Sequence, residues 1–178
     1  LLSAGSQLAR LLQVFVEYRT AHLVSAERTE SFINIANLER SQGRRDTAEA
    51  YYQTALRLFD RFVPAYINLA DLYREWQRER DAERILMTGL QRLPDQPDLL
   101  HSLGLSLVRQ DRLTEAMPLF AAAAAAPEAP PRYTLVYAIG LETTENREAA
   151  IEVLEQGLER YGENAELRNA YLQFTQAP

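Results

Sequence analysis

Small and apolar residues recur along this chain at intervals of 34 positions. Four alanines mark the period, and each has a large apolar residue four positions later: Ala48 with Tyr52, Ala82 with Leu86, Ala116 with Phe120, and Ala150 with Leu154. Small residues also stand seven positions after these alanines (Ala55, Gly89, Ala123 and Gly157) and twelve before them (Ala36, Ala70, Gly104 and Ala138). Apolar residues between these positions fall at helical spacing. The pattern predicts a repeated pair of helices, an A helix and a B helix, with small residues where two backbones approach closely.

The period divides the chain into four full repeats with a partial repeat at each end. We place the repeats at residues 29–62, 63–96, 97–130 and 131–164, after an N-terminal helical segment over 1–28 and before a C-terminal capping helix over 165–178. Residues 7–25 have the pattern of a B helix, because Val14, Tyr18 and Ala21 stand one period before Ala48, Tyr52 and Ala55. The sequence therefore predicts ten helices and no strands.

The turns between A and B helices are predicted at four equivalent positions. Gly43 and Asp111 suit a left-handed backbone, whereas Gln77 and Glu145 at the same place suit it less well. If Thr114 caps the third B helix, Pro118 lies close to the first turn of that helix.

The composition excludes several kinds of chemistry. A net charge of −6 disfavours binding to nucleic acid, which needs clustered cations. The chain has no cysteine and no lysine, so disulfides, thiolate catalysis, cysteine–zinc sites and Schiff bases are all absent. No apolar run has the length of a membrane span. The two histidines, His22 and His101, lie in repeats too far apart to share a metal. We expect no enzymatic activity, no cofactor and no metal site.

The residues at these spacings resemble the signature of the tetratricopeptide repeat (TPR) family over nearly the whole chain. The second repeat matches best, with Tyr66, Leu69, Ala70, Tyr73, Ala82, Leu86, Gly89 and Pro94 at signature positions. Glu39 in the first repeat and Thr134 in the fourth depart from it, each where a large apolar residue is usual. The resemblance implies an all-α, right-handed solenoid that acts as a non-catalytic protein–protein interaction scaffold.

In TPR proteins the A helices line a concave groove that holds a protein or peptide ligand. Transferred to this chain, the groove positions are Ile33, Asn34, Asn37, Arg40, Ile67, Asn68, Asp71, Arg74, Asp98, His101, Leu105, Val108, Arg132, Leu135, Ile139 and Glu142. The apolar members would suit an amphipathic helix or an extended peptide. The alternative is that they pack against the chain's own terminal helices or an upstream domain. The family's clamp for a terminal carboxylate is absent, because Ile33, Asp98 and Ser102 occupy its three cationic positions.

A second resemblance concerns the stretch from Phe15 to Tyr66, which is similar to TPR segments of large bacterial multihaem cytochrome c-like proteins. It implies a docking module of an exported redox protein and a periplasmic location; otherwise we expect a cytoplasmic one. The chain begins with Leu1, and we expect it to be a fragment of a longer protein. Terminal apolar residues, among them Leu8 and Leu12, leave a homodimer through the terminal helices open.

Overall fold

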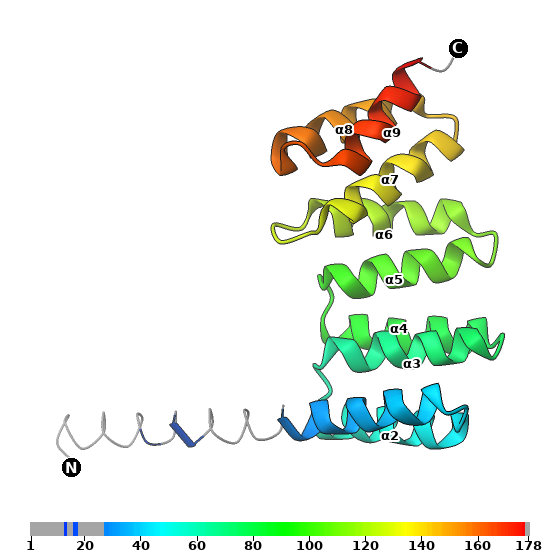
Figure 1. Ribbon diagram of the computed structural model, residues 1–178, viewed down its shortest axis with the longest axis vertical. Helices are drawn as coiled ribbons and strands as arrows, with labels where there is room; N and C mark the ends of the chain where they lie inside the picture. The colour runs from blue at the N-terminus through cyan, green and yellow to red at the C-terminus, as the bar shows by residue number, and fades with distance from the viewer. Residues whose placement is uncertain (1–12, 14–15, 18–26, 177–178) are drawn as a thin grey trace. The chain divides into compact units, whose positions relative to one another are not determined.

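The computed structural model describes residue 13, residues 16–17 and residues 27–176. This part of the chain contains helices and no strands (Figure 1). The first A helix covers residues 27–41. The others are α2 (Arg45–Leu58), α3 (Val63–Glu75), α4 (Glu79–Arg92), α5 (Pro97–Val108), α6 (Leu113–Ala125), α7 (Pro131–Thr143), α8 (Arg147–Tyr161) and α9 (Ala165–Gln176). These nine helices confirm nine of the ten predicted; the tenth, over 7–25, lies outside the described residues except for Gln13, Val16 and Glu17.

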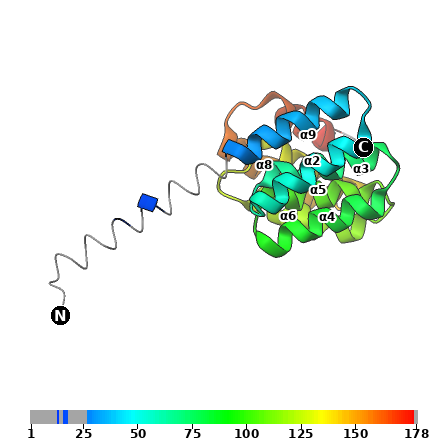
Figure 2. The same cartoon turned by 90° about the horizontal axis from the view of Figure 1, so that it is seen from below.

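The described chain forms two compact units, and the division falls within α3. The N-terminal unit ends at Leu72 and the C-terminal unit begins at Tyr73. In the C-terminal unit each helix from α4 to α8 packs against the next helix along the chain (Figure 1; Figure 2). In addition, α7 contacts α9. The helices are thus arranged as a succession of neighbours, as expected for stacked helical pairs.

All twelve small positions of the repeat are buried. The alanines at these positions have no exposed surface, and Gly89, Gly104 and Gly157 are buried as well. A Cβ atom added at Gly104 would lie 2.4 Å from the ring of Phe120, and one at Gly157 would lie 2.8 Å from the methyl group of Thr134. Small residues stand at these positions because α5 and α8 pack too closely against their neighbours for a larger side chain. Thr134, which departs from the family signature, is 5% exposed and fills the space above Gly157.

Each A helix ends in the same left-handed turn. Gly43, Gln77, Asp111 and Glu145 have φ values of 74°, 59°, 58° and 60°. In each turn the amide of the next residue donates to a carbonyl five positions before it, as Arg112 does to Leu107 at 3.0 Å and Asn146 to Leu141 at 2.9 Å. This is the hydrogen-bond pattern of a Schellman cap, which satisfies carbonyl groups left free at a helix end. The prediction for Gly43 and Asp111 is confirmed, and Gln77 and Glu145 adopt the same conformation despite their Cβ atoms.

The start of α6 differs from the prediction. The helix begins at Leu113 after Arg112, so Thr114 lies inside the helix and Pro118 is its sixth residue. Thr114 is therefore not the cap, because the left-handed turn at Asp111 is followed directly by Arg112 at the N-cap position, two residues earlier than a Thr114 cap would be. Side-chain caps occur at two later helices: Asn146 accepts from the Ala149 amide at 3.4 Å, and Asn164 accepts from the Leu167 amide at 3.0 Å.

Candidate functional site

The predicted groove residues fall into rows of equivalent positions on successive A helices. One row contains Ile33, Ile67, His101 and Leu135; the next contains Asn37, Asp71, Leu105 and Ile139; and the third contains Arg40, Arg74, Val108 and Glu142. The first row is the most buried, because Ile33 is only 6% exposed and His101 only 7%. These two side chains therefore offer little surface to a ligand. The second and third rows are half-buried or exposed throughout.

In the N-terminal unit, the predicted asparagines bond to other side chains of the same unit. The Asn37 Oδ1 atom accepts from the Tyr52 hydroxyl at 2.5 Å and from the Asn68 amide nitrogen at 3.4 Å. These bonds connect the helix over 27–41 to α2 and to α3. Asn34 and Asn37 are exposed, while Arg40, Ile67, Asn68 and Asp71 are half-buried. The asparagines thus have a structural role in fixing the two A helices, and a ligand would have to compete for Asn37.

In the C-terminal unit, Tyr133 connects the N-terminal ends of α5 and α7. Its hydroxyl donates to Asp98 and also lies 3.4 Å from the Nη2 atom of Arg132, whose guanidinium carbon is 5.1 Å from the centre of the Tyr133 ring. Burial, and then the hydrogen bond to Asp98, raises the pKa of Tyr133, so the phenol stays protonated. Asp98 is half-buried in this contact, whereas Arg132 is exposed. Tyr133 was not among the predicted site residues.

His101 is enclosed between two aromatic rings. Its ring stacks on Tyr133 at a centroid distance of 4.1 Å and lies 5.7 Å from Phe120 of α6. The Nδ1 atom is buried and has no hydrogen-bond partner. Burial, followed by the nearby positive charge of Arg132, lowers the pKa of His101 to about 4, although Asp98 acts in the opposite direction. His101 is consequently a neutral packing residue at neutral pH.

The apolar members of the remaining predicted positions are Leu105 and Val108 on α5 and Leu135 and Ile139 on α7, and we call these four residues the apolar strip. Val108 is 38% exposed and Ile139 is 48% exposed, while Leu105 and Leu135 are half-buried. Glu142, at the C-terminal end of the strip, is paired with Arg147 at 2.9 Å. Arg132 is the exposed predicted cation at the opposite end of α7. The strip therefore offers apolar contacts with an accessible positive charge at one end.

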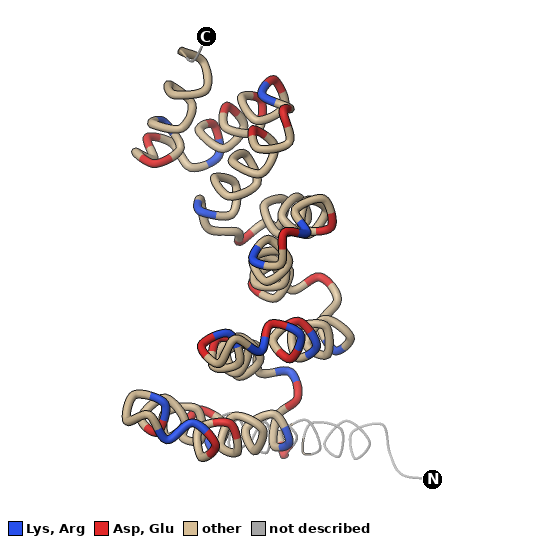
Figure 3. Tube along the Cα trace, turned by 90° about the vertical axis from the view of Figure 1, so that its right-hand side faces the viewer, with Lys and Arg blue, Asp and Glu red and all other residues tan. Residues whose placement is uncertain are grey.

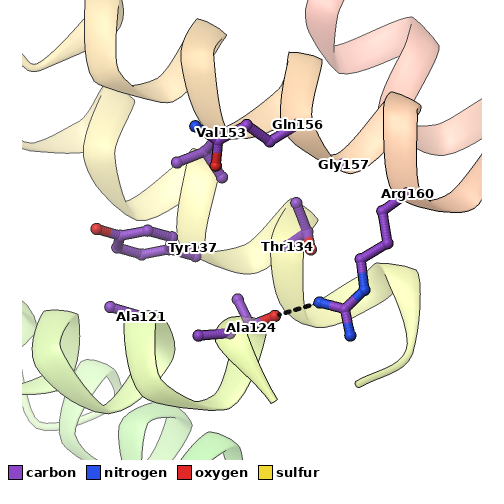
Figure 4. A pocket seen from close by; sticks show the side chains of 9 residues that line it. Ala121, Ala124, Thr134, Tyr137, Val153, Gln156, Gly157 and Arg160 are labelled. Atoms are coloured by element: carbon purple, nitrogen blue, oxygen red, sulfur yellow. Dashed lines mark hydrogen bonds between the residues drawn. The ribbon is translucent and has the colours of Figure 1, made fainter. Parts of the chain in front are cut away.

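A separate pocket of about 210 Å³ lies among α6, α7 and α8 (Figure 4). Ala121, Ala124 and Ala125 of α6 line one side of it, and Tyr137 and Val153 line another. Arg160 reaches across from α8 and donates to the carbonyl groups of Ala124, at 3.1 Å, and of Ala126 and Pro127. It thereby satisfies carbonyls at the C-terminal end of α6. The alanine run makes this pocket possible because methyl side chains leave the space unfilled.

Charges of both signs are interspersed along the helices, and α6 carries few (Figure 3). Among the residues that the structure describes, no group of histidine and carboxylate side chains could hold a metal ion. Within the same residues, none of the helices combines the length and the apolar character needed to cross a membrane.

Comparisons with known proteins agree with the repeat. A family model described as tetratricopeptide repeat matches residues 39–104. No curated protein matches the chain. Among solved structures, a thermophilic TPR protein in Thermus thermophilus superposes with a TM-score of 0.66 at 18% identity, covering 97% of this chain and 96% of that one. PilF of Pseudomonas aeruginosa gives a TM-score of 0.67 at 16% identity, covering 84% and 68%. YrrB, a TPR protein with an unusual peptide-binding site, gives 0.61 at 22% identity, covering 80% and 74%.

Proposed function

We propose that the chain is a non-catalytic scaffold that binds a peptide segment of a partner protein along the apolar strip. The match of residues 39–104 to the tetratricopeptide repeat model and the all-α solenoid fold shared with solved TPR proteins support this proposal. The strip consists of Leu105 and Val108 on α5 and of Leu135 and Ile139 on α7. Leu105 and Ile139 stand at equivalent positions of adjacent repeats, so one ligand can meet the same kind of contact twice.

The observation that carries the proposal is the exposure of large apolar side chains at predicted groove positions of α5 and α7. Ile139 is 48% exposed and Val108 is 38% exposed, although both belong to well-packed helices of the C-terminal unit. Each exposed apolar group costs free energy in water that a ligand's apolar side chain recovers on binding. Leu105 lies one turn before Val108 on α5, and Leu135 lies one turn before Ile139 on α7; both leucines are half-buried. Because these side chains are held by their helices before the ligand binds, less conformational entropy is lost on binding.

The charges near the strip indicate the class of ligand. Arg132 is exposed at one end of α7, and Glu142 at the other end is already paired with Arg147. A ligand with apolar side chains at helical or extended spacing and one acidic residue would pair with Arg132. The name of YrrB records peptide binding for that protein, and the shared fold supports the same kind of ligand here.

Selection of peptides from a random display library, followed by measured affinities, tests the proposal. We expect wild-type protein to enrich peptides with apolar anchors and at least one acidic residue. Ile139→Arg should weaken their binding by about tenfold or more, which corresponds to about 1.4 kcal/mol. Met87→Arg is the matched control, because Met87 is 49% exposed on α4, a B helix. Failure to enrich peptides, or equal losses in both variants, would contradict the proposal.

The other predictions about function stay predictions. The predicted groove residues of the N-terminal unit, Ile33 to Asp71, are a binding surface to be tested separately, by comparing the ligand affinity of an Ile67 variant with that of the wild-type protein. The docking role in an exported multihaem redox protein, the homodimer and the compartment likewise stay predictions. We expect no enzymatic activity.

A further inference from the structure

We propose that the pocket among α6, α7 and α8 is a second binding site, which takes one aromatic side chain of a partner protein together with an acidic residue beside it. The pocket has a volume of about 210 Å³ and is partly open at the surface (Figure 4). It shares no residue with the apolar strip, so the inference does not rest on the proposed peptide-binding function.

The α6 side of the pocket consists of alanines at positions where every other repeat has a longer side chain. The position of Ala124 holds leucine in the other three repeats: Leu56, Leu90 and Leu158. The positions of Ala121 and Ala125 hold longer polar or apolar residues: Gln53, Met87 and Glu155 for the first, and Arg57, Gln91 and Glu159 for the second. Leu158 packs against the buried cluster of α7, α8 and α9, whereas a methyl group at the same place leaves room.

The α7 side of the pocket is shortened as well. Thr134 lines it, and the equivalent residues of the three earlier repeats are large: Phe32, Tyr66 and Leu100. The methyl group of Thr134 lies against Gly157, where an added Cβ atom would be 2.8 Å away. Because side chains are shortened on both helices at one place, the space between them stays open. The atoms that line such a space lack contacts that an apolar ligand group supplies on binding.

The size of the pocket determines how large an apolar group it can hold. An apolar cavity of about 150 Å³ takes up benzene. Sites for whole small-molecule ligands usually measure about 300–1,000 Å³. At about 210 Å³ the pocket has room for one aromatic ring and little else, and Tyr137 offers a ring for aromatic contact. A single aromatic side chain that inserts from a partner protein matches this size, and such side chains commonly anchor protein interfaces.

Arg160 supplies a positive charge at the end of the pocket opposite Tyr137 (Figure 4). Its guanidinium group is held by the carbonyl groups of Ala124, Ala126 and Pro127, which are neutral acceptors. Within the part of the chain that the structure describes, no carboxylate forms an ion pair with Arg160. An acidic residue next to the aromatic anchor would complement this charge and gain a charge-assisted hydrogen bond.

Titration of the full chain with small peptide probes, followed by NMR, tests the inference. The probes are blocked dipeptides of aspartate and phenylalanine, in both orders. We expect the better of the two to shift the amide resonances of Tyr137, Val153 and Gln156. Replacing phenylalanine by alanine in that probe should weaken binding at least fivefold, and replacing aspartate by asparagine at least threefold. The acidic group is removed from the probe and Arg160 is kept, because Arg160 also caps α6.

Variants of α6 locate the site. Ala124→Leu inserts the side chain of the equivalent positions and should weaken binding at least fivefold. Ala122→Leu is the matched control, because Ala122 is exposed on the same helix and does not line the pocket. Ala121→Met, with the residue of the second repeat, is a further filling variant should Ala124→Leu fail to fold. Ile139→Arg on the apolar strip should leave probe binding unchanged, which separates this site from the proposed function.

Four results would each overturn the inference. The first is no shift at the pocket residues with either probe. The second is equal affinity in the filling variants and in Ala122→Leu. The third is equal affinity for the aspartate and asparagine probes. The fourth is tighter binding of phenylpropionate than of both dipeptides, which would assign the pocket to a free aromatic acid instead of a side chain of a partner protein.

Discussion

His101 and Tyr133 stack face to face, with ring centroids 4.1 Å apart, although they belong to successive A helices of the solenoid. The Tyr133 hydroxyl extends the contact to Asp98, which lies one turn before His101 on α5. Adjacent repeats are therefore connected by a polar and aromatic cluster in addition to the repeated small residues. A buried imidazole within that cluster makes the stability of the C-terminal unit depend on pH.

The stability of the protein should fall on acidification because of His101. Its pKa in the folded state is about 4, below the ordinary value of 6.5. Between these two pH values the unfolded chain binds more protons than the folded chain, so acid favours unfolding. We expect a loss on the order of 2 kcal/mol between about pH 7 and pH 4. Urea unfolding across this range measures it.

His101→Leu is the control for this prediction. Leucine occupies the equivalent position 135, and it removes both the titrating group and the unbonded Nδ1 atom. The free energy of unfolding of the variant should depend less steeply on pH. The dependence that remains is due to the titration of carboxylate groups. Equal slopes for the two proteins would contradict the assignment to His101.

Gly104→Ala should destabilise the protein, against the usual effect in a helix. At an uncrowded helical position this change stabilises by about 1 kcal/mol. Here the new Cβ atom would lie 2.4 Å from Phe120, so we expect a net loss of about 1–3 kcal/mol from overpacking. Thermal and urea unfolding measure the change.

Phe120→Leu should relieve that loss when it is combined with Gly104→Ala. The fourth repeat already uses the pair Ala138 and Leu154, which belong to one buried cluster. The double variant should be more stable than the sum of the two single changes predicts. Strict additivity would show that the Phe120 ring is not the obstacle.

Glu145→Gly should stabilise the protein by about 0.5–1 kcal/mol, because the residue has a φ of 60° that glycine adopts without a steric penalty. Gly43→Ala should have the opposite sign, since Gly43 has a φ of 74° and no atom within 4 Å of an added Cβ. Because nothing obstructs the added Cβ atom, only the backbone conformation can account for a loss of stability in Gly43→Ala. Opposite shifts in melting temperature are the expected result, and a shift of the same sign in both variants would contradict it.

The repeated features of the fold could be predicted from the sequence, whereas the features of single repeats could not. The buried alanines and the turn at Asp111 depend on local patterns that recur every 34 positions. The contact of Tyr133 with Asp98 and the bonds from Arg160 to the end of α6 depend on which side chains face each other between helices. No other repeat combines an arginine at the position of Arg160 with an alanine run at the end of the preceding B helix. The 34-residue period therefore could not predict the bonds from Arg160.

The exposure of the predicted groove residues follows only in part from the sequence pattern. The signature placed Leu105, Val108 and Ile139 on one face of their helices, and each of them is half-buried or exposed. His101 occupies a position of the same kind but is covered by Tyr133, a residue from the next repeat. Burial of this kind depends on the neighbouring side chain, which the spacing alone does not specify.

Bonds between separate helices in the described chain span about half a repeat, as from Tyr52 to Asn37 over 15 residues, or close to a whole repeat. The Ser106–Glu79 bond spans 27 residues, and the Arg160–Ala124 bond spans 36. Folding then requires the closure of short chain loops only, at a low contact order, which favours fast folding. A whole repeat inserted or deleted in register would preserve such contacts on either side of the change. Duplication of one repeat is therefore a route by which a chain of this kind changes length while it keeps its packing.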